Sequence, residues 1–347
     1  MRLGLFQGYS GKNFSINMDA VLEAERLGFD SVWSSEAYGS DAVTPAAWIL
    51  ARTTRINVGT GIIQMAARTP ACAAMTALTL QALSGNRFIL GVGPSGPQVI
   101  EGWHGVAYGR PLARTREYIS IIRKIFAREK PVTHEGYHYQ LPYTGPGASG
   151  LGKPLRSILQ GDPGLKIFTA AVTPKGIRLA AEIADGMFPI FMSPERFDVF
   201  EGDLNAGFAE AGGGKSLENF EIEPIVPLAM GPSVEMCRQP IRRLLALYIG
   251  GMGAPNKNFY NDYAKRLGYE EAAVKIQQLY LAGKKKEAEA AVPKELIDAI
   301  ALVGPKERVK ERLAAWKDTA REGKVSSLLL SGGTTPEALR FVAEEVL

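Results

Sequence analysis

Short apolar runs alternate with longer amphipathic stretches along most of the chain. Each short run spans four to eight residues, a length typical of buried β-strands. The longer stretches repeat apolar residues every three to four positions, as Ala20, Ala24 and Leu27 do, and this period predicts α-helices. The predicted strands are 2–8, 30–33, 56–63, 87–92, 166–171, 186–190, 222–229 and 325–330. The predicted helices are 15–28, 44–52, 70–83, 174–184, 194–211 and 304–321.

This alternation of strands and helices predicts a parallel sheet with right-handed crossovers. Eight strands favour an α/β fold with a single (β/α)8 TIM barrel over residues 1–347, because no change of composition marks a linker between two domains. Such a barrel uses about 250 residues, so about a hundred belong to insertions. We expect the insertions near 94–113, 130–165 and 234–300, at the end of the barrel where the strands terminate, called the mouth below.

Composition and charge exclude several classes of protein. The chain has 347 residues, a formal net charge of +4 and 46% hydrophobic residues. Disorder and nucleic-acid binding are not expected from this balance, and no apolar run approaches the roughly 18 residues of a membrane span. Two cysteines far apart and three histidines give no metal-ligand spacing, so we expect no metal site. A reducing cytosol is the expected compartment, because the cysteines form no redox pair and no signal peptide is recognisable.

Candidate proton-transfer groups follow two of the predicted strands, where the active sites of such barrels lie. Glu36 and Tyr38 come after strand 30–33 and combine an acid with a phenol. Glu36 has a structural alternative, in which it caps a turn or pairs with an arginine. His104 lies in the loop after strand 87–92 and has the alternative role of a hydrogen-bonded structural histidine.

Three loops are candidates for presenting backbone amides to a ligand. Glycine inside a strand marks a bulge or the close approach of another group, and a helix N-terminus suits a phosphate. No GxxxxGK[ST] motif is present, and plain connections are the alternative in each case. The candidate residues are Thr60 and Gly61 after strand 56–63, Gly93, Ser95 and Gly96 after strand 87–92, and Ala171, Val172 and Thr173 before Pro174.

Four blocks of sequence, in this order, resemble the luciferase-like family of flavin and deazaflavin barrels, and within it the coenzyme F420-dependent oxidoreductases. The blocks are AERLGFDSVWSSEAYGSDAVTPAAWILARTTRINVGTGI, RTPACAAMTALTLQALSGNRFILGVGPSGPQVIEGWHG, RPLARTREYISIIR and AAEIADGMFP. They cover most of residues 1–190, and the C-terminal GPKERVKERL…VSSLLL also looks like the end of the family's barrel.

The resemblance implies that coenzyme F420, a deazaflavin whose C5 carries a hydride, lies in the mouth. It implies a cis peptide bond between Gly61 and Ile62, in a bulge that supports one face of the ring and leaves the other face to the substrate. It also implies that the anionic tail of F420 contacts the loops after strands 87–92 and 166–171. The implied cofactor-binding residues are Ser35, Glu36, Thr60, Gly61, Ile62, Gly93, Ser95, Gly96, Ala171, Val172 and Thr173.

Two positions depart from the family's pattern. Glu36 and Ala37 stand where several relatives have Asp-His, so a catalytic histidine is missing there, and Glu36, Tyr38 or His104 would handle the proton. Thr173 stands where many members have glycine, so a hydroxyl would replace the close approach of the backbone.

The resemblance leaves several functions open. The first is hydride transfer between F420 and a small organic substrate that contains C=C, C=N or an alcohol or carbonyl group. The alternatives are an FMN-dependent luciferase-like monooxygenase, a methylenetetrahydromethanopterin reductase-like enzyme and a non-catalytic homologue. The family also implies a homodimer, and we expect the insertions to select the substrate.

Overall fold

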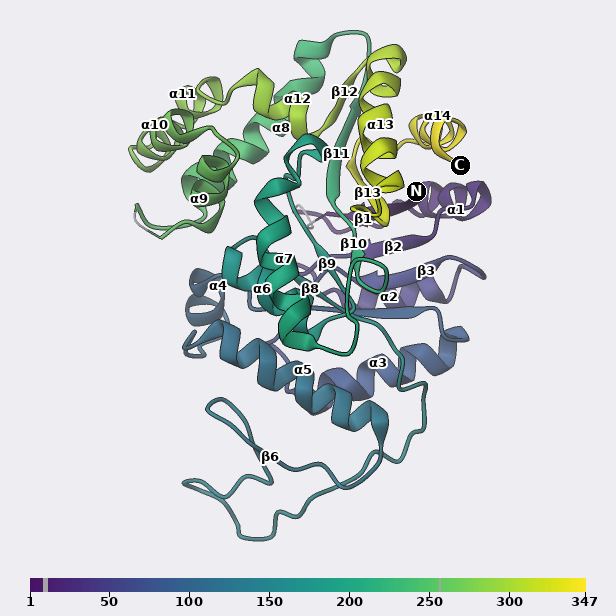
Figure 1. Ribbon diagram of the computed structural model, residues 1–347, viewed down its shortest axis with the longest axis vertical. Helices are drawn as coiled ribbons and strands as arrows, with labels where there is room; N and C mark the ends of the chain where they lie inside the picture. Colours follow the sequence, from purple (N-terminus) through teal and green to yellow (C-terminus); the bar gives the residue numbers. More distant parts are fainter. Residues whose placement is uncertain (9–11, 256) are drawn as a thin grey trace.

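A curled parallel sheet forms the centre of the protein (Figure 1). The computed structural model describes residues 1–8, 12–255 and 257–347. Ten strands follow the order β10-β9-β8-β5-β3-β2-β1-β13-β11-β12, and β4 pairs with β5 as the eleventh strand. The strands are β1 Arg2–Gln7, β2 Ser31–Ser34, β3 Asn57–Thr60, β4 Ile63–Gln64, β5 Phe88–Gly93, β8 Ile167–Ala170, β9 Gly186–Phe188, β10 Glu221–Ile222, β11 Ile225–Met230, β12 Leu302–Gly304 and β13 Ser327–Gly332.

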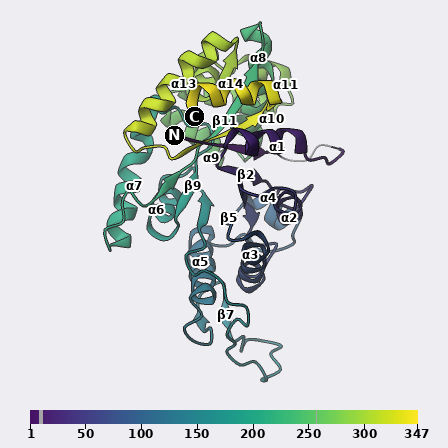
Figure 2. The ribbon, with the colours of Figure 1, turned by 90° about the vertical axis from the view of Figure 1, so that its right-hand side faces the viewer.

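Helices surround this sheet, as Figure 2 shows from the side on which both termini lie. Local signals set their ends: α1 begins after Asn17, whose side chain accepts the Ala20 N–H, and stops at Gly28 with φ 89°. Within the described ranges, no helix has the length and apolar character needed to cross a membrane. The helices are α1 Met18–Leu27, α2 Val43–Leu50, α3 Pro70–Ser84, α4 Pro97–Gly102, α5 Pro111–Ala127, α6 Pro174–Ile183, α7 Asp198–Ala211, α8 Val234–Ala246, α9 Phe259–Arg266, α10 Glu270–Leu281, α11 Lys285–Ala290, α12 Lys294–Ile300, α13 Lys306–Arg321 and α14 Pro336–Val346.

The curl of the sheet brings β9 close to β11. A parallel bridge pairs Ile190 with Ile225, and the Ile225 N–H donates to the Pro189 carbonyl at 3.0 Å. Aromatic side chains fill the space inside the curl: Trp33 packs against Phe188 with ring centroids 4.6 Å apart. A Cβ atom on Gly59 would lie only 2.1 Å from the Trp33 ring, so this glycine makes room for the indole.

A strand overlaps each of the eight predicted ranges, but two of the ranges are interrupted. Range 56–63 is divided into β3 and β4 by the Gly61–Ile62 bulge. Range 222–229 is divided into β10 and β11 around Glu223 and Pro224. Sequence periodicity did not reveal either interruption, because both halves remain apolar on the buried side.

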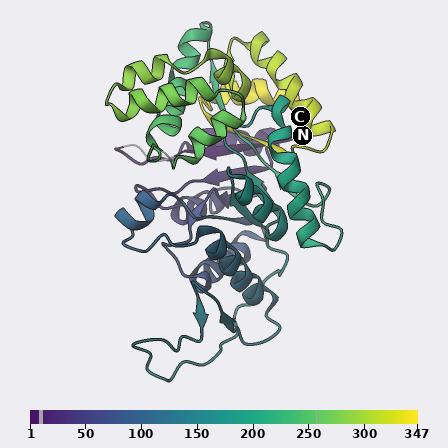
Figure 3. The same cartoon turned by 60° about the vertical axis from the view of Figure 1, so that its left-hand side comes forward.

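Two of the three expected insertions join the end of a strand to a helix. Segment 94–113 follows β5 and contains α4, and segment 234–300 follows β11 and contains α8 to α12. In Figure 3 these segments, slate blue and green in colour, come forward on the same side of the molecule.

The third segment, 130–165, differs from the other two in the elements that it connects. It connects the end of α5 to the start of β8, and a helix-to-strand connection enters a parallel sheet at the opposite end. The segment forms an arm that projects from the body (Figure 1) and contains a hairpin, with β6 His134–Glu135 antiparallel to β7 Gln140–Leu141. Near its root the Val132 N–H donates to the Leu155 carbonyl at 2.8 Å, so the arm leaves and returns at one place.

Candidate functional site

Glu36, in the loop after β2, is buried and accepts hydrogen bonds from three directions. Its carboxylate receives the Ala42 N–H at 3.1 Å and the Gln64 N–H at 2.9 Å. The Arg68 Nη1 donates to both oxygens at 2.8 and 2.9 Å. Burial alone would lower the pKa of Arg68, but the hydrogen bond and charge of Glu36 raise it above its ordinary value. Glu36 therefore connects the loop after β2 to α2, β4 and the loop that follows β4.

The bulge between β3 and β4 contains the cis peptide bond Gly61–Ile62, which confirms the expectation from the sequence. The Thr60 hydroxyl donates to the Gly91 carbonyl at 2.9 Å and accepts the Gly91 N–H at 3.0 Å, so it joins the strands where their ladder ends. Ile62 is partly exposed and packs against the aromatic cluster inside the curl. A Cβ atom on Gly93 would lie 2.9 Å from the Ile62 side chain, so a glycine is required beside the bulge.

His104 meets Gln64 in the loop after β5. Its Nε2 lies 2.5 Å from the Gln64 Oε1, and the Gln64 Nε2 donates to the Ser95 hydroxyl at 3.3 Å. Ser95 adopts a left-handed backbone with φ 57°, and its carbonyl accepts the Tyr108 hydroxyl at 3.1 Å. Gly96 follows as the residue that precedes the first turn of α4.

The loop after β8 leads into α6, and the Thr173 hydroxyl of this loop binds the backbone of the helix. Thr173 accepts the Gly176 N–H at 3.1 Å and so caps the helix, while Ala171 is buried behind it. Arg266 comes from α9 and donates to the Val172 carbonyl. Among the described residues no carboxylate forms an ion pair with Arg266, and burial lowers the pKa of its guanidinium. The structure thus places a partly buried cation beside the N-terminus of α6.

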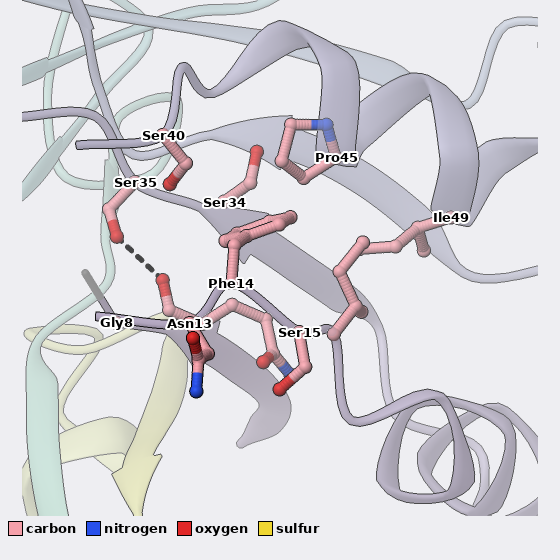
Figure 4. A pocket seen from close by; sticks show the side chains of 11 residues that line it. Gly8, Asn13, Phe14, Ser15, Ser34, Ser35, Ser40, Pro45 and Ile49 are labelled. Carbon is pink, nitrogen blue, oxygen red and sulfur yellow. Dashed lines mark hydrogen bonds between the residues drawn. The ribbon is translucent and has the colours of Figure 1, made fainter. Parts of the chain in front are cut away.

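A cavity of about 220 Å³ lies between the end of β1 and the loop after β2 (Figure 4). Ser34 and Ser35 line it, and their hydroxyls donate to the carbonyls of Ala42 and Gln7, each at 2.6 Å. Both serine oxygens therefore keep lone pairs to accept from a ligand. The other lining residues are Gln7, Gly8, Asn13, Phe14, Ser15, Ile16, Ser40, Pro45 and Ile49.

The structure brings some of the predicted residues together and leaves others apart. Glu36, Ser95 and His104 belong to one network through Gln64, whereas Tyr38 is 66% exposed and faces solvent. Sequence reasoning missed three residues, Gln64, Arg68 and Arg266. A polar side chain at the end of a buried strand was a usable signal for Gln64, but no local signal marked Arg266, which is 94 residues away from Val172.

Comparison with known proteins identifies the family. The sequence profile of the luciferase-like monooxygenases matches residues 2–322. A Mycobacterium tuberculosis protein, provisionally assigned as a coenzyme F420-dependent oxidoreductase, is 46% identical over 99% of this chain and 98% of its own length. The F420-dependent tetrahydromethanopterin reductase of Methanopyrus kandleri superimposes with a TM-score of 0.77 at 20% identity, over 99% of this chain and 98% of that structure. An F420-dependent secondary alcohol dehydrogenase, solved with an F420–acetone adduct, gives a TM-score of 0.75 at 18% identity, over 100% of this chain and 98% of that structure. The chain therefore belongs to the luciferase-like monooxygenase family.

Proposed function

We propose that this protein is a coenzyme F420-dependent oxidoreductase that transfers a hydride to or from a small organic substrate. The observation that carries the proposal is the bulge after β3, where the partly exposed apolar side chain of Ile62 lies against the aromatic cluster inside the curl. The names of the relatives support the same cofactor. The substrate is a C=C, C=N or alcohol or carbonyl compound, in keeping with the different reactions of those relatives.

The residues present fit an anionic deazaflavin. Its flat ring suits the apolar bulge of Thr60, Gly61 and Ile62, and its charged tail suits an arginine that has no carboxylate partner in the described ranges. Arg266 and the N-terminal amides of α6 would hold the tail together with Ser95, Gly96, Val172 and Thr173. When bound, the cofactor supplies the hydride.

The proton that accompanies hydride transfer is handled by His104 in this proposal. His104 is partly exposed and its Nε2 is held by Gln64, so the other ring nitrogen is the one that exchanges a proton. Glu36 contributes as a positioning residue, because its oxygens already receive four hydrogen bonds. Tyr38 is assigned a contact with the substrate, since it extends from the same loop into solvent.

Several finer features belong to the same proposal. We infer that the sheet is a (β/α)8 barrel with additional strands, which the Ile190–Ile225 bridge between β9 and β11 supports. We also carry forward the homodimer from the family resemblance and the cytosolic location from the cysteine pattern of the sequence.

The direct test is a cofactor titration. Purified protein is expected to quench F420 fluorescence at micromolar concentrations and to leave FMN fluorescence unchanged. Tight binding of FMN without F420 would support the monooxygenase instead, and binding of neither would support the non-catalytic homologue. A panel of enones, imines, pterins and secondary alcohols, assayed by the absorbance change of F420, would then identify the substrate class.

A further inference from the structure

We propose that Gln64 is a positioning residue that holds a hydrogen on Nε2 of His104, so that Nδ1 is the nitrogen that exchanges the catalytic proton. The inference rests on the proposed function for its catalytic meaning. The geometry itself is independent of any cofactor, and it consists of the His104–Gln64–Ser95 chain of hydrogen bonds.

Gln64 is held in place by both its backbone and its side chain. It is 1% exposed and ends β4, where it pairs in parallel register with Gly93 of β5. Its N–H donates to Glu36 at 2.9 Å, and Glu36 is bound in turn by Arg68. The carboxamide has its oxygen toward His104 and its nitrogen toward Ser95.

An amide oxygen accepts hydrogen bonds and cannot donate them. The His104 Nε2 must therefore carry a hydrogen at the 2.5 Å contact, whether the imidazole is neutral or cationic. In the neutral ring Nδ1 is then unprotonated. A glutamine, unlike a carboxylate, sets this arrangement without placing a negative charge beside the ring.

This arrangement supplies the proton that the reduction of a polar double bond requires. As the hydride and its electron pair add to one atom of the polar double bond, the neighbouring atom forms a bond to the proton of the imidazolium Nδ1. The Nδ1–H bond breaks and its electron pair stays on nitrogen. The product is the neutral Nε2–H tautomer, which is the one Gln64 binds. Solvent restores the proton because His104 is partly exposed, and oxidation of an alcohol follows the reverse path.

Charged and titratable groups lie on the elements that pack around Gln64 and His104. Glu36 and Arg68 lie behind Gln64 and neutralise each other. Glu101, on α4, accepts the Tyr108 N–H, and the Tyr108 hydroxyl reaches the Ser95 carbonyl. Arg114 of α5 binds the Ala107 carbonyl close to Tyr108. Of these side chains, Gln64 is the one in direct contact with His104. A charge introduced at position 64 would therefore lie closer to the ring than the existing charges do.

The test uses nitrogen NMR on the full protein without cofactor. The chain has only three histidines, so His134→Gln and His138→Gln variants assign the ring signals. We expect the neutral form of His104 to show a protonated Nε2 and an unprotonated Nδ1. In Gln64→Glu the carboxylate should raise the His104 titration midpoint by about one pH unit or more, a tenfold gain in proton affinity. In Gln64→Met the tautomer preference should disappear, which gives a second measurement if Gln64→Glu folds poorly.

The outcomes separate this inference from the proposed function. A dominant Nδ1–H tautomer, or a midpoint that does not move in Gln64→Glu, would overturn the inference. With F420 and substrate, the pH profile of kcat/KM should move in the same direction as the NMR midpoint, and it should not move when His104→Gln is added. If the enzyme is active with F420 but its pH profile does not move in Gln64→Glu, the inference is wrong and the proposed function stands. If the expected NMR result is obtained but the protein does not bind F420, only the proposed function is wrong.

Discussion

At the scale of single residues, Glu36 shows how a loop carboxylate can serve the site without moving a proton. Its oxygens bind the backbone of two elements and one guanidinium, so its negative charge orients its neighbours. In the proposed function the proton is then transferred by His104, through the ring nitrogen that Gln64 does not contact. A carboxylate at this position in the sequence is compatible with either role, and only the hydrogen bonds favour the positioning role.

Glu36→Gln should lower the rate of hydride transfer by about tenfold while changing F420 affinity little. The amide keeps the shape but loses the charge that holds Arg68, so the loop and Gln64 lose their fixed orientation. Stopped-flow absorbance of F420 measures the rate, and fluorescence titration measures the affinity. Glu344→Gln, on the exposed face of α14, is the matched control. An unchanged rate in Glu36→Gln would reject the positioning role.

Arg266→Ala should weaken F420 binding by about tenfold and make it less sensitive to salt. The guanidinium beside Val172 has no carboxylate partner among the described residues, so its charge is available to an anionic tail. Titrations at two salt concentrations measure both effects. Lys265→Ala removes a cation from the same helix, one that already contacts Asp262 at 3.7 Å, and should bind F420 normally. Equal losses in the two variants would argue against a specific contact.

At the scale of elements, apolar periodicity located all eight predicted strands, because burial requires the same pattern in any parallel sheet. It missed features that depend on distant partners. Glu117 on α5 determines the position of the hairpin, and Arg266 on α9 reaches the loop after β8. Site residues directly after strands were predictable from topology. Gln64 was missed although it is a polar residue at the end of a buried strand, because its contacts depend on the interruption between β3 and β4.

The attachment of the arm to α5 gives a prediction at this scale. The Glu117 carboxylate accepts the N–H groups of Tyr137, His138 and Tyr139 at 2.9 to 3.0 Å. Burial would raise its pKa, but these backbone hydrogen bonds lower it below the ordinary value. Glu117→Ala should therefore speed amide exchange in residues 134–141 by at least about tenfold and leave the sheet protected. Exchange mass spectrometry resolves the two regions, and unchanged hairpin exchange would contradict the proposed attachment.

At the scale of the whole molecule, one buried carboxyl makes stability depend on pH. Glu223 lies between β10 and β11, and it is 1% exposed. Its Oε2 has no hydrogen-bond partner in the described part of the chain. Burial raises its pKa to about 8, against the opposing charge of Arg2, 3.6 Å away. In the unfolded chain this group ionises near its ordinary value, so the folded state binds the extra proton between the two values.

Glu223→Gln should accordingly flatten the pH dependence of unfolding. As pH rises from the unfolded pKa toward about 8, wild type should lose about 1.4 kcal/mol of stability per pH unit through this group. The glutamine variant should lack that slope and be the more stable protein at pH 8. Urea denaturation at pH 5 to 8 measures the difference, and parallel curves for the two proteins would refute the assignment.

The root of the arm, where Val132 and Leu155 meet, makes the arm a replaceable module. Chain that leaves and returns at one place can be shortened, or exchanged for a guest domain, at little cost in loop entropy. The root lies between α5 and β8, at the end of the sheet opposite the mouth. A reporter domain inserted at this root would be attached at the end of the sheet opposite the carboxyl ends of the strands.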